Sequence, residues 1–201
     1  MFSKRKQLLL HICCGPCVSG IVDFLRKQNF DVTGFYYNPN IYPYGEYKKR
    51  LDTVTEFASK INLEIVHLGF SKNSYTKQVA AFYDITKDHT QKPGRCLLCY
   101  KMRLEETARK AKELHIKNFS TTLLISPYQN IDAIQQMGNS ISKNHGLNFF
   151  PDHHSKKKFK GFRRFFTFCK RIAKRHNMYS QKYCGCLYPK KEAVAERKKV
   201  R

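Results

Sequence analysis

The chain has 201 residues, 41% of them hydrophobic, which suits one domain with an ordinary core. No run of about 18 apolar residues occurs, and this argues against a membrane span. Lys and Arg number 38 against 15 Asp and Glu, so the net charge is +23. Such an excess favours polyanionic partners, most commonly nucleic acid, over the alternative of a chain that is basic without such a partner.

The N-terminus is basic up to Gln7 and then apolar from Leu8 to Ile12. This apolar stretch is too short for the core of a secretory signal. We interpret it as a basic tail that leads into a first strand, and we therefore expect a cytoplasmic protein.

Apolar runs of strand length alternate along the chain with segments of helical period. The expected strands are residues 8–12, 32–37, 63–68, 119–125 and 147–150. The expected helices are 18–25, 47–58, 75–83, 96–114, and one that starts at 131 and stops at 144–146. This order predicts an α/β fold, with a mostly parallel sheet of about five strands and helices on both faces.

The character of the sequence changes after Pro151. Residues 156–174 are dense in Lys, Arg and Phe, which predicts a basic amphipathic helix. We expect one α/β domain over residues 1–189, in which 156–189 form a basic C-terminal segment that closes over the site. Residues 190–201 are expected to be a charged tail.

Eight cysteines in a chain expected to be cytoplasmic indicate metal or redox chemistry rather than disulfides. Seven of them fall in three tight clusters, and Cys169 stands alone as an expected core residue. The clusters are Cys13, Cys14 and Cys17; Cys96 and Cys99; and Cys184 and Cys186. Clustering at three separate places in the chain predicts that the thiols converge in space.

The first cluster sits where the first strand meets the first helix. Ligands of open α/β sheets bind at this edge, and a helix N-terminus stabilises thiolate, the form that binds iron. Cys96 and Cys99 share one helix face, and Gly185 gives the backbone freedom to aim the last pair. Seven thiols exceed the four that one zinc or one cubane cluster needs. A cluster with a second metal, a cluster beside a redox thiol pair, and a four-cysteine zinc site with three bystanders remain open.

A few other residues lie at the expected strand ends. Asp152 is a candidate metal ligand or proton donor, or simply part of a solvated turn. Asn38, Asn40 and Tyr42 are candidates for binding a base or ribose, or are turn formers. His11 is expected to be a satisfied core histidine.

With these motifs the sequence resembles a known family over about residues 7 to 188, the cobalamin-independent epoxyqueuosine reductases of the QueH family. The matching stretches are LLLHICCGPC, GFYYNPNIYPYGEYKKR, GRCLLCYKMRLEETA, FSTTLLISPYQN and YSQKYCGCLY, in the expected order. The resemblance implies a Rossmann-like fold and the last step of queuosine biosynthesis. In that step the epoxide of epoxyqueuosine, at the wobble position of a GUN-type tRNA anticodon, is reduced to the alkene.

The resemblance further implies a [4Fe-4S] cluster and an additional mononuclear iron. The residues carried over as the metal site are Cys13, Cys14, Cys17, Cys96, Cys99, Cys184 and Cys186, with Cys13, Cys14, Cys96 and Cys99 assigned to the cluster. The family's Asp-Phe-Arg-like stretch is replaced by Asp152-His153-His154, so its arginine is missing. Lys156, Lys157 or Arg163 are candidates to replace it.

Removing an epoxide oxygen takes two electrons and two protons. A one-electron donor such as ferredoxin or flavodoxin suits an iron–sulfur site, and Asp152 or Tyr128 are candidate proton donors. An anticodon loop can splay a base onto aromatic rings while Lys and Arg hold its phosphates. The candidate tRNA contacts are Asn38, Asn40, Tyr42, Gln129, Lys156, Lys157, Arg163 and Arg164.

Two other functions compete with the reductase. One is a zinc-stabilised RNA-binding protein without catalysis, which would be colourless. The other is a tRNA sulfur-transfer or ATP-dependent enzyme, which would need a glycine-rich phosphate loop at the first strand–helix turn. That turn has a single glycine, Gly15, followed by a proline.

Overall fold

The protein is an α/β domain built on a parallel sheet. The computed structural model describes residues 5–69, 71–150, 162–181, 183–186 and 188. Within these residues the sheet has five strands in the order β3-β2-β1-β4-β5. They are β1 (Lys6–His11), β2 (Phe30–Tyr36), β3 (Ile65–His67), β4 (Asn118–Thr121) and β5 (Asn148–Phe149). All four pairings are parallel, which confirms the expected fold class.

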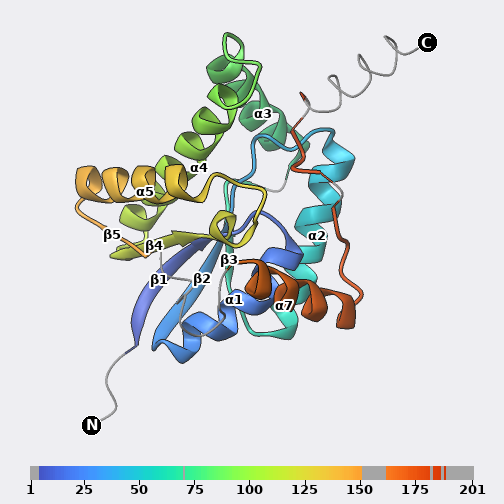
Figure 1. The fold of residues 1–201 in the computed structure, drawn as a ribbon, viewed down its shortest axis with the longest axis vertical. Helices are drawn as coiled ribbons and strands as arrows, with labels where there is room; N and C mark the ends of the chain where they lie inside the picture. Colours follow the sequence, from blue (N-terminus) through green and yellow to red (C-terminus); the bar gives the residue numbers. More distant parts are fainter. Residues whose placement is uncertain (1–4, 70, 151–161, 182, 187, 189–201) are drawn as a thin grey trace.

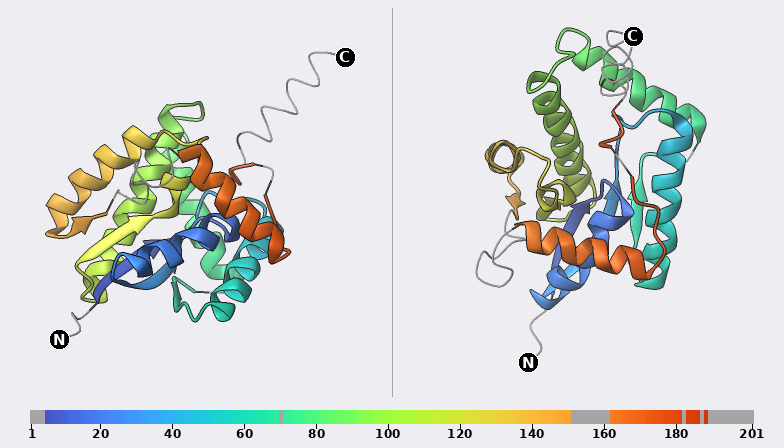
Figure 2. Two further views of the ribbon diagram at one scale, coloured as in Figure 1. Left: turned by 60° about the horizontal axis from the view of Figure 1, so that its bottom comes forward. Right: turned by 45° about the vertical axis from the view of Figure 1, so that its right-hand side comes forward.

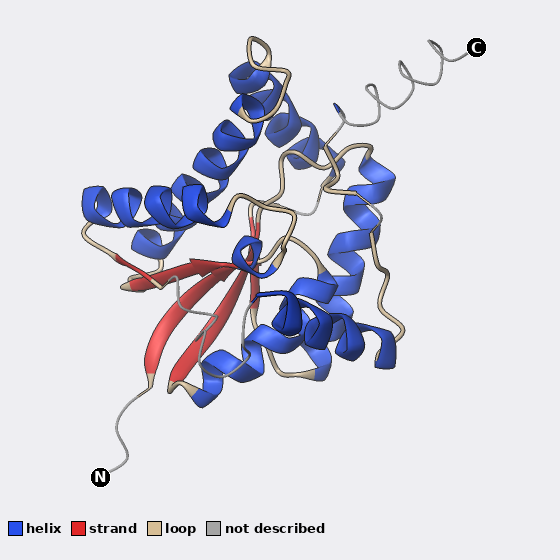
Figure 3. Cartoon of the chain, viewed as in Figure 1, coloured by secondary structure: helices blue, strands red, loops and turns tan. Residues whose placement is uncertain are grey.

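Helices cover both faces of this sheet (Figure 1). They are α1 (Gly15–Lys27), α2 (Tyr44–Lys60), α3 (Lys72–Thr86), α4 (Gly94–Glu113), α5 (Ile131–His145) and α7 (Phe162–Arg175). Leu8 and Leu10 belong to a core shared with α1, α2 and α7, whereas Leu9 belongs to a core shared with α4 and α5. Figure 3 shows the strands with helices on either side of them. The period of two along β1 therefore divides the apolar residues between two cores.

The order of the strands creates a switch point at the centre of the sheet. From β1 the chain crosses to β2 on one side, whereas β4 pairs with β1 on the other side. Ligands of open α/β sheets bind at the carboxyl ends of the strands where the order reverses. The segments after β1 and β4 therefore frame the place where a site is expected.

Three predicted strands are longer than the observed ones, and the one expected over 147–150 is reduced to Asn148–Phe149. The strand expected over 119–125 ends at Thr121, and Thr122–Ile125 form a 3₁₀ helix, η1. Its start is capped, since Leu123 N donates to Thr121 Oγ1 over 3.1 Å. Local capping here overrides the apolar, strand-like pattern. The strand expected over 63–68 is confined to Ile65–His67 at the edge of the sheet.

The basic C-terminal helix packs on α1 through its apolar face (Figure 2). Phe165 is fully buried, and Cys169 is a buried core residue, as expected. A Cβ on Gly20 would lie 2.8 Å from Cys169 Sγ, so glycine at this position lets the two helices approach closely. The expected helix over 156–174 is described from Phe162 onward. The tail at 190–201 lies outside the described residues.

Candidate metal centre

The turn between β1 and α1 brings three thiols together. Cys14 is the extended N-cap residue of α1, and Pro16 follows in the first turn, where its missing N–H costs no hydrogen bond. The sulfur atoms of Cys13, Cys14 and Cys17 all lie within 4.8 Å of one another. Cys14 and Cys17 are buried and Cys13 is half-buried. Three converging thiols at a helix N-terminus form a donor set that fits a thiophilic metal.

Charge in this triad is concentrated on Cys13. Hydrogen bonding with the Cys14 thiol, and then with the Cys17 thiol, holds the pKa of Cys13 well below its usual range. The same contacts raise the pKa values of Cys14 and Cys17. Thr122 of η1 contributes twice, because its Oγ1 accepts from Cys13 N over 2.9 Å and lies 3.2 Å from Cys13 Sγ. Because β4 ends at Thr121, the next residue, Thr122, lies in η1, where it contacts Cys13.

The other four clustered cysteines form a looser group. Cys96 and Cys99 lie in the first two turns of α4, and burial raises the pKa of both thiols. Burial likewise raises the pKa of Cys186, to about 12, and its interactions with Cys184 and Cys99 raise it further. Among the described residues, however, only the triad has three ligand atoms within 4.8 Å. The structure therefore gathers three of the seven thiols tightly, and the other four form a separate group whose members interact with one another.

A buried arginine connects the two groups of thiols. Arg103 is only 5% exposed, and no carboxylate pairs with it in the described part of the chain. Its guanidinium donates to Asn38 Oδ1 over 2.5 Å and to His11 Nε2 over 3.3 Å, and lies 4.0 Å from Cys99 Sγ. Its charge lowers the pKa of Cys13 and opposes the effect of burial on Cys99. An uncompensated buried cation is costly, so this environment favours negative charge on the thiols.

His11 is a core residue, as expected. It is fully buried, its Nδ1 lies 2.7 Å from Thr121 Oγ1, and its Nε2 lies 3.0 Å from Tyr37 O. Burial, followed by the nearby Arg103, lowers its pKa to about 3, so the ring is neutral at physiological pH. Since Nε2 of a neutral ring either donates or accepts, it forms a hydrogen bond with Tyr37 O in one tautomer and with Arg103 in the other.

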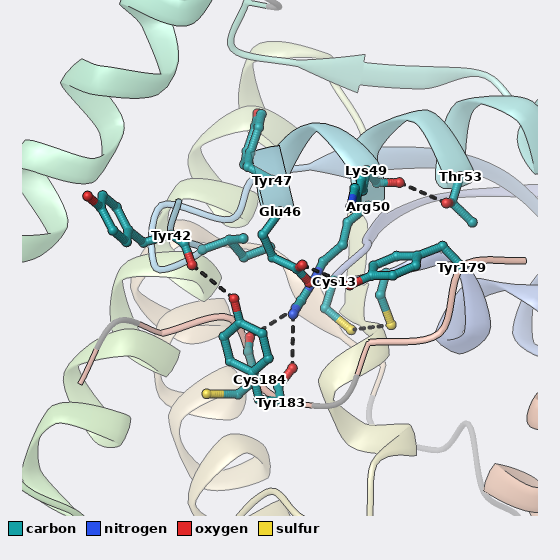
Figure 4. A network of polar contacts seen from close by, with 12 residues as sticks. Cys13, Tyr42, Glu46, Tyr47, Lys49, Arg50, Thr53, Tyr179, Tyr183 and Cys184 are labelled. Atoms are coloured by element: carbon teal, nitrogen blue, oxygen red, sulfur yellow. Dashed lines mark hydrogen bonds and ion pairs between the residues drawn. The ribbon is translucent and has the colours of Figure 1, made fainter. Parts of the chain in front are cut away.

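A second buried arginine holds the Cys184–Cys186 segment against α2 (Figure 4). Arg50 donates to Tyr183 O over 2.9 Å and to Cys184 O over 3.1 Å. Its Nε pairs with Glu46 Oε1 at 2.8 Å, and the two side chains are 3% and 11% exposed. Gly185 has φ +100°, and a Cβ there would lie 2.8 Å from Ile41 and 3.0 Å from Arg50 Nη1. Arg50 and Gly185 together fix how this segment approaches the rim.

Arg50→Ala is therefore expected to release the Cys184–Cys186 segment. Hydrogen bonds from a charged donor contribute about 1.5–3 kcal/mol each, so the buried Cys186 thiol should react about 10–100-fold faster with a maleimide in metal-free protein. The rate is measured by intact-protein and peptide mass spectrometry. Lys48→Ala, an exposed position in an ion pair on the same helix, is the matched control. Unchanged labelling of Cys186 in Arg50→Ala would contradict this role.

The residues predicted to contact the tRNA differ in burial and in their hydrogen-bond partners. Asn38 is fully buried and its amide is engaged, since Nδ2 donates to Ile12 O over 2.9 Å while Oδ1 accepts from Arg103. Asn40 is buried 3.4 Å from Cys184 O, whereas Tyr42 is exposed. Gln129 accepts from Tyr100 Oη over 2.8 Å.

Tyr128 and Arg164 are both exposed. Asp152, Lys156, Lys157 and the side chain of Arg163 lie outside the described residues.

Three residues of this site are not predicted from the sequence: Arg103, Arg50 and Thr122. One local signal was available for each arginine. Arg103 follows Cys99 by four residues, so both lie on one face of α4, and Arg50 follows Glu46 by four residues on α2. Thr122 had no such signal, because it was predicted to lie in a strand.

The strand order and the thiols at the carboxyl ends of the strands define an α/β protein with three converged thiols, a donor set suited to a metal, at its switch point. No helix in the described residues is both long and apolar enough to cross a membrane. The family model for "Epoxyqueuosine reductase QueH" matches residues 8–192 of this chain. The chain therefore belongs to the epoxyqueuosine reductase QueH family.

Two relatives support this placement, and two solved structures share the fold. Epoxyqueuosine reductase QueH of Thermotoga maritima is 34% identical over 183 residues, covering 90% of this chain and 88% of the relative. That of Streptococcus pyogenes is 31% identical over 195 residues, covering 94% and 72%.

The U34-tRNA thiolase NcsA from Methanococcus maripaludis, solved with its [4Fe-4S] cluster, has a TM-score of 0.55 at 14% identity, over 92% of this chain and 62% of the thiolase. A predicted tRNA methyltransferase subunit from Methanocaldococcus jannaschii has a TM-score of 0.52 at 13% identity, over 90% and 94%. At these identities the two structures show a shared fold.

Proposed function

We propose that this chain reduces the epoxide of epoxyqueuosine in tRNA to the alkene of queuosine. The family match over residues 8–192 carries this proposal. The reaction takes up two electrons and two protons, breaks both C–O bonds of the epoxide and releases the oxygen as water. The family match does not favour the zinc-stabilised binding protein or the sulfur-transfer enzyme as alternatives.

The proposed cofactor is a [4Fe-4S] cluster held by the Cys13, Cys14 and Cys17 triad. Its support is the mutual approach of three sulfur atoms within 4.8 Å and the lowered pKa of Cys13, because iron is bound by thiolate. When bound, such a cluster would supply electrons one at a time. The assignment of Cys96 and Cys99, together with Cys13 and Cys14, to the cluster stays a prediction, and so does an additional mononuclear iron.

The polypeptide contributes binding, charge and protons. Arg103 favours negative charge near Cys13 and Cys99, and Arg50 holds the Cys184–Cys186 segment in place. Asp152 and Tyr128 stay predictions as proton donors. The proposed partners are a tRNA with a GUN-type anticodon and a one-electron donor such as ferredoxin or flavodoxin, and the tRNA substrate supports a cytoplasmic location.

The test begins with anaerobic purification and analysis of iron and acid-labile sulfide. The protein is expected to be brown, with a visible band that bleaches with dithionite. It is then incubated with epoxyqueuosine-containing tRNA and dithionite, and the digested nucleosides are measured by mass spectrometry. Conversion to queuosine is expected. A fully iron-loaded protein that leaves epoxyqueuosine untouched would show that the proposed activity is wrong.

A further inference from the structure

A cavity of about 900 Å³ opens beside the outer side of the cysteine turn. It lies between the first turn of α1, the loop after η1 and the exposed side of α7. Its lining includes Pro16, Pro127, Tyr128, Phe166, Lys170 and Lys174. Pro16 stands between Cys14 and Cys17 in the sequence, so the cavity adjoins the backbone that carries the triad.

An exposed aromatic ring stands at this cavity. Tyr128 is 83% exposed. Among the described residues, the other exposed large hydrophobic side chains are at most 45% exposed. Its ring makes an edge contact with Phe166, at 6.0 Å between centroids and 88° between planes. This contact orients the tyrosine while most of its surface stays open to solvent. A ring held in this way can stack on a planar ligand.

Positively charged side chains line the α7 side of the cavity that holds the Tyr128 ring. Lys170, Arg171 and Lys174 line the cavity from α7, and Lys170 Nζ lies 5.7 Å from the centre of the Phe166 ring. All three cations are exposed, and none of the described residues that line the cavity is acidic. The ligand is therefore expected to combine a planar apolar part with negative charge.

We propose that this cavity binds one unpaired nucleotide of RNA, with its base stacked on Tyr128 and the adjoining phosphates held by Lys170, Arg171 and Lys174. Bases of single-stranded loops bind proteins by stacking on aromatic rings, with Lys and Arg at the phosphates. Cys14 and Cys17 are 1% and 4% exposed, so the thiols are not open on this side. The nucleotide is therefore a neighbour of the modified one, an assignment that rests on the proposed function.

The proposed stacking of a base on Tyr128 is tested with an anticodon stem-loop RNA that carries 2-aminopurine at one loop position at a time. Stacking on Tyr128 quenches the fluorescence of one position in the wild-type complex. Tyr128→Ala is expected to lose this quench and to weaken binding about tenfold, as expected for one base–aromatic stack. Tyr128→Phe keeps the ring and is expected to bind like the wild type. Because Tyr128 is exposed, neither change should disturb folding.

The proposed binding of phosphates by the α7 cations is tested by the salt dependence of RNA binding. The double variant Lys170→Ala/Lys174→Ala removes two phosphate contacts, so the slope of log K against log salt should fall by roughly 1.4, at about 0.7 per contact for a single strand. Lys77→Ala/Lys112→Ala, at exposed positions of α3 and α4, makes the same change in net charge and should keep the wild-type slope.

Three results would overturn the assignment: tight binding by Tyr128→Ala, an equal loss of slope in the control pair, or displacement of the RNA by poly-glutamate at matched charge. Failure of the proposed function looks different. In that case the quench and its loss in Tyr128→Ala would persist, while the iron-loaded wild type would leave epoxyqueuosine unreduced. If the wild type reduces epoxyqueuosine and Tyr128→Ala binds the RNA as tightly as the wild type, the nucleotide site in the cavity is rejected and the proposed function is kept.

Discussion

Replacing Cys13 by serine is expected to abolish metal loading and epoxyqueuosine reduction. Cys13 is the triad member with the lowered pKa, and its sulfur lies 3.6 Å from that of Cys14. A serine hydroxyl does not ionise near pH 7 and is a poor ligand for iron. Loss of an outer-shell partner alone costs about 10–100-fold in metal sites, so loss of a ligand should cost more than about a hundredfold in activity.

The measurement is the iron and sulfide content, the visible absorbance and the conversion of tRNA-bound epoxyqueuosine. Cys169→Ser is the matched control, because it makes the same change at a buried cysteine that packs between α7 and α1. Burial raises the pKa of the Cys169 thiol to about 12, as befits a core residue. The control should keep its colour. A brown, active Cys13→Ser protein would show that the triad does not hold the cofactor.

Arg103→Gln is expected to move metal loading to higher pH. Hydrogen bonds with Cys14 and Cys17 are the main reason for the low pKa of Cys13, and the positive charge of Arg103 lowers it further. Removing that charge raises the pKa of Cys13, so less thiolate is present at a given pH. Since metals bind the thiolate, affinity at pH 7 falls and recovers as the pH rises through the new pKa.

The pH dependence is measured by iodoacetamide alkylation of metal-free protein and by titration with ferrous iron. Arg103→Lys keeps the charge and should remain near the wild-type profile. Arg109→Gln changes the charge of the same helix at an exposed ion pair and should leave the profile unchanged.

Arg103→Gln should also lower the free energy of unfolding by about 1–3 kcal/mol, because Asn38 Oδ1 loses its buried donor. A pH profile that matches the wild type, despite this lower stability, would limit Arg103 to a structural role.

The sequence predicts the parts of this site that depend on neighbours along the chain. The Cys13–Cys17 turn follows from an apolar strand, a proline in the first helical turn and spacing within five residues. The alternation of strands and helices likewise follows from local periodicity. The approach of Cys184 to α4 depends on contacts between segments far apart in the sequence. Nothing local predicts that Arg50 will bind the carbonyls of Tyr183 and Cys184.

The early end of β4 has the same physical origin. Residues 119–125 are apolar or β-branched and predict a strand that includes Thr122, yet a cap at Thr121 ends the strand early. Asn38 stays a candidate substrate contact, and the sequence does not predict that its amide binds Ile12 O and the Arg103 guanidinium. A buried polar network of this kind is decided by three-dimensional packing rather than by spacing.

The attachment of residues 183–184 to Arg50 also sets an order of events during synthesis. The three thiols of the triad come from neighbouring residues between β1 and α1, whereas the carbonyl partners of the Arg50 guanidinium are translated after α7. Domains are generally completed as units when the chain emerges. A ribosome-bound chain that stops after α7 therefore carries Cys13, Cys14, Cys17, Cys96 and Cys99 but neither Cys184 nor Cys186. The buried Arg50 side chain gains its two carbonyl partners only after residues 183 and 184 have been added.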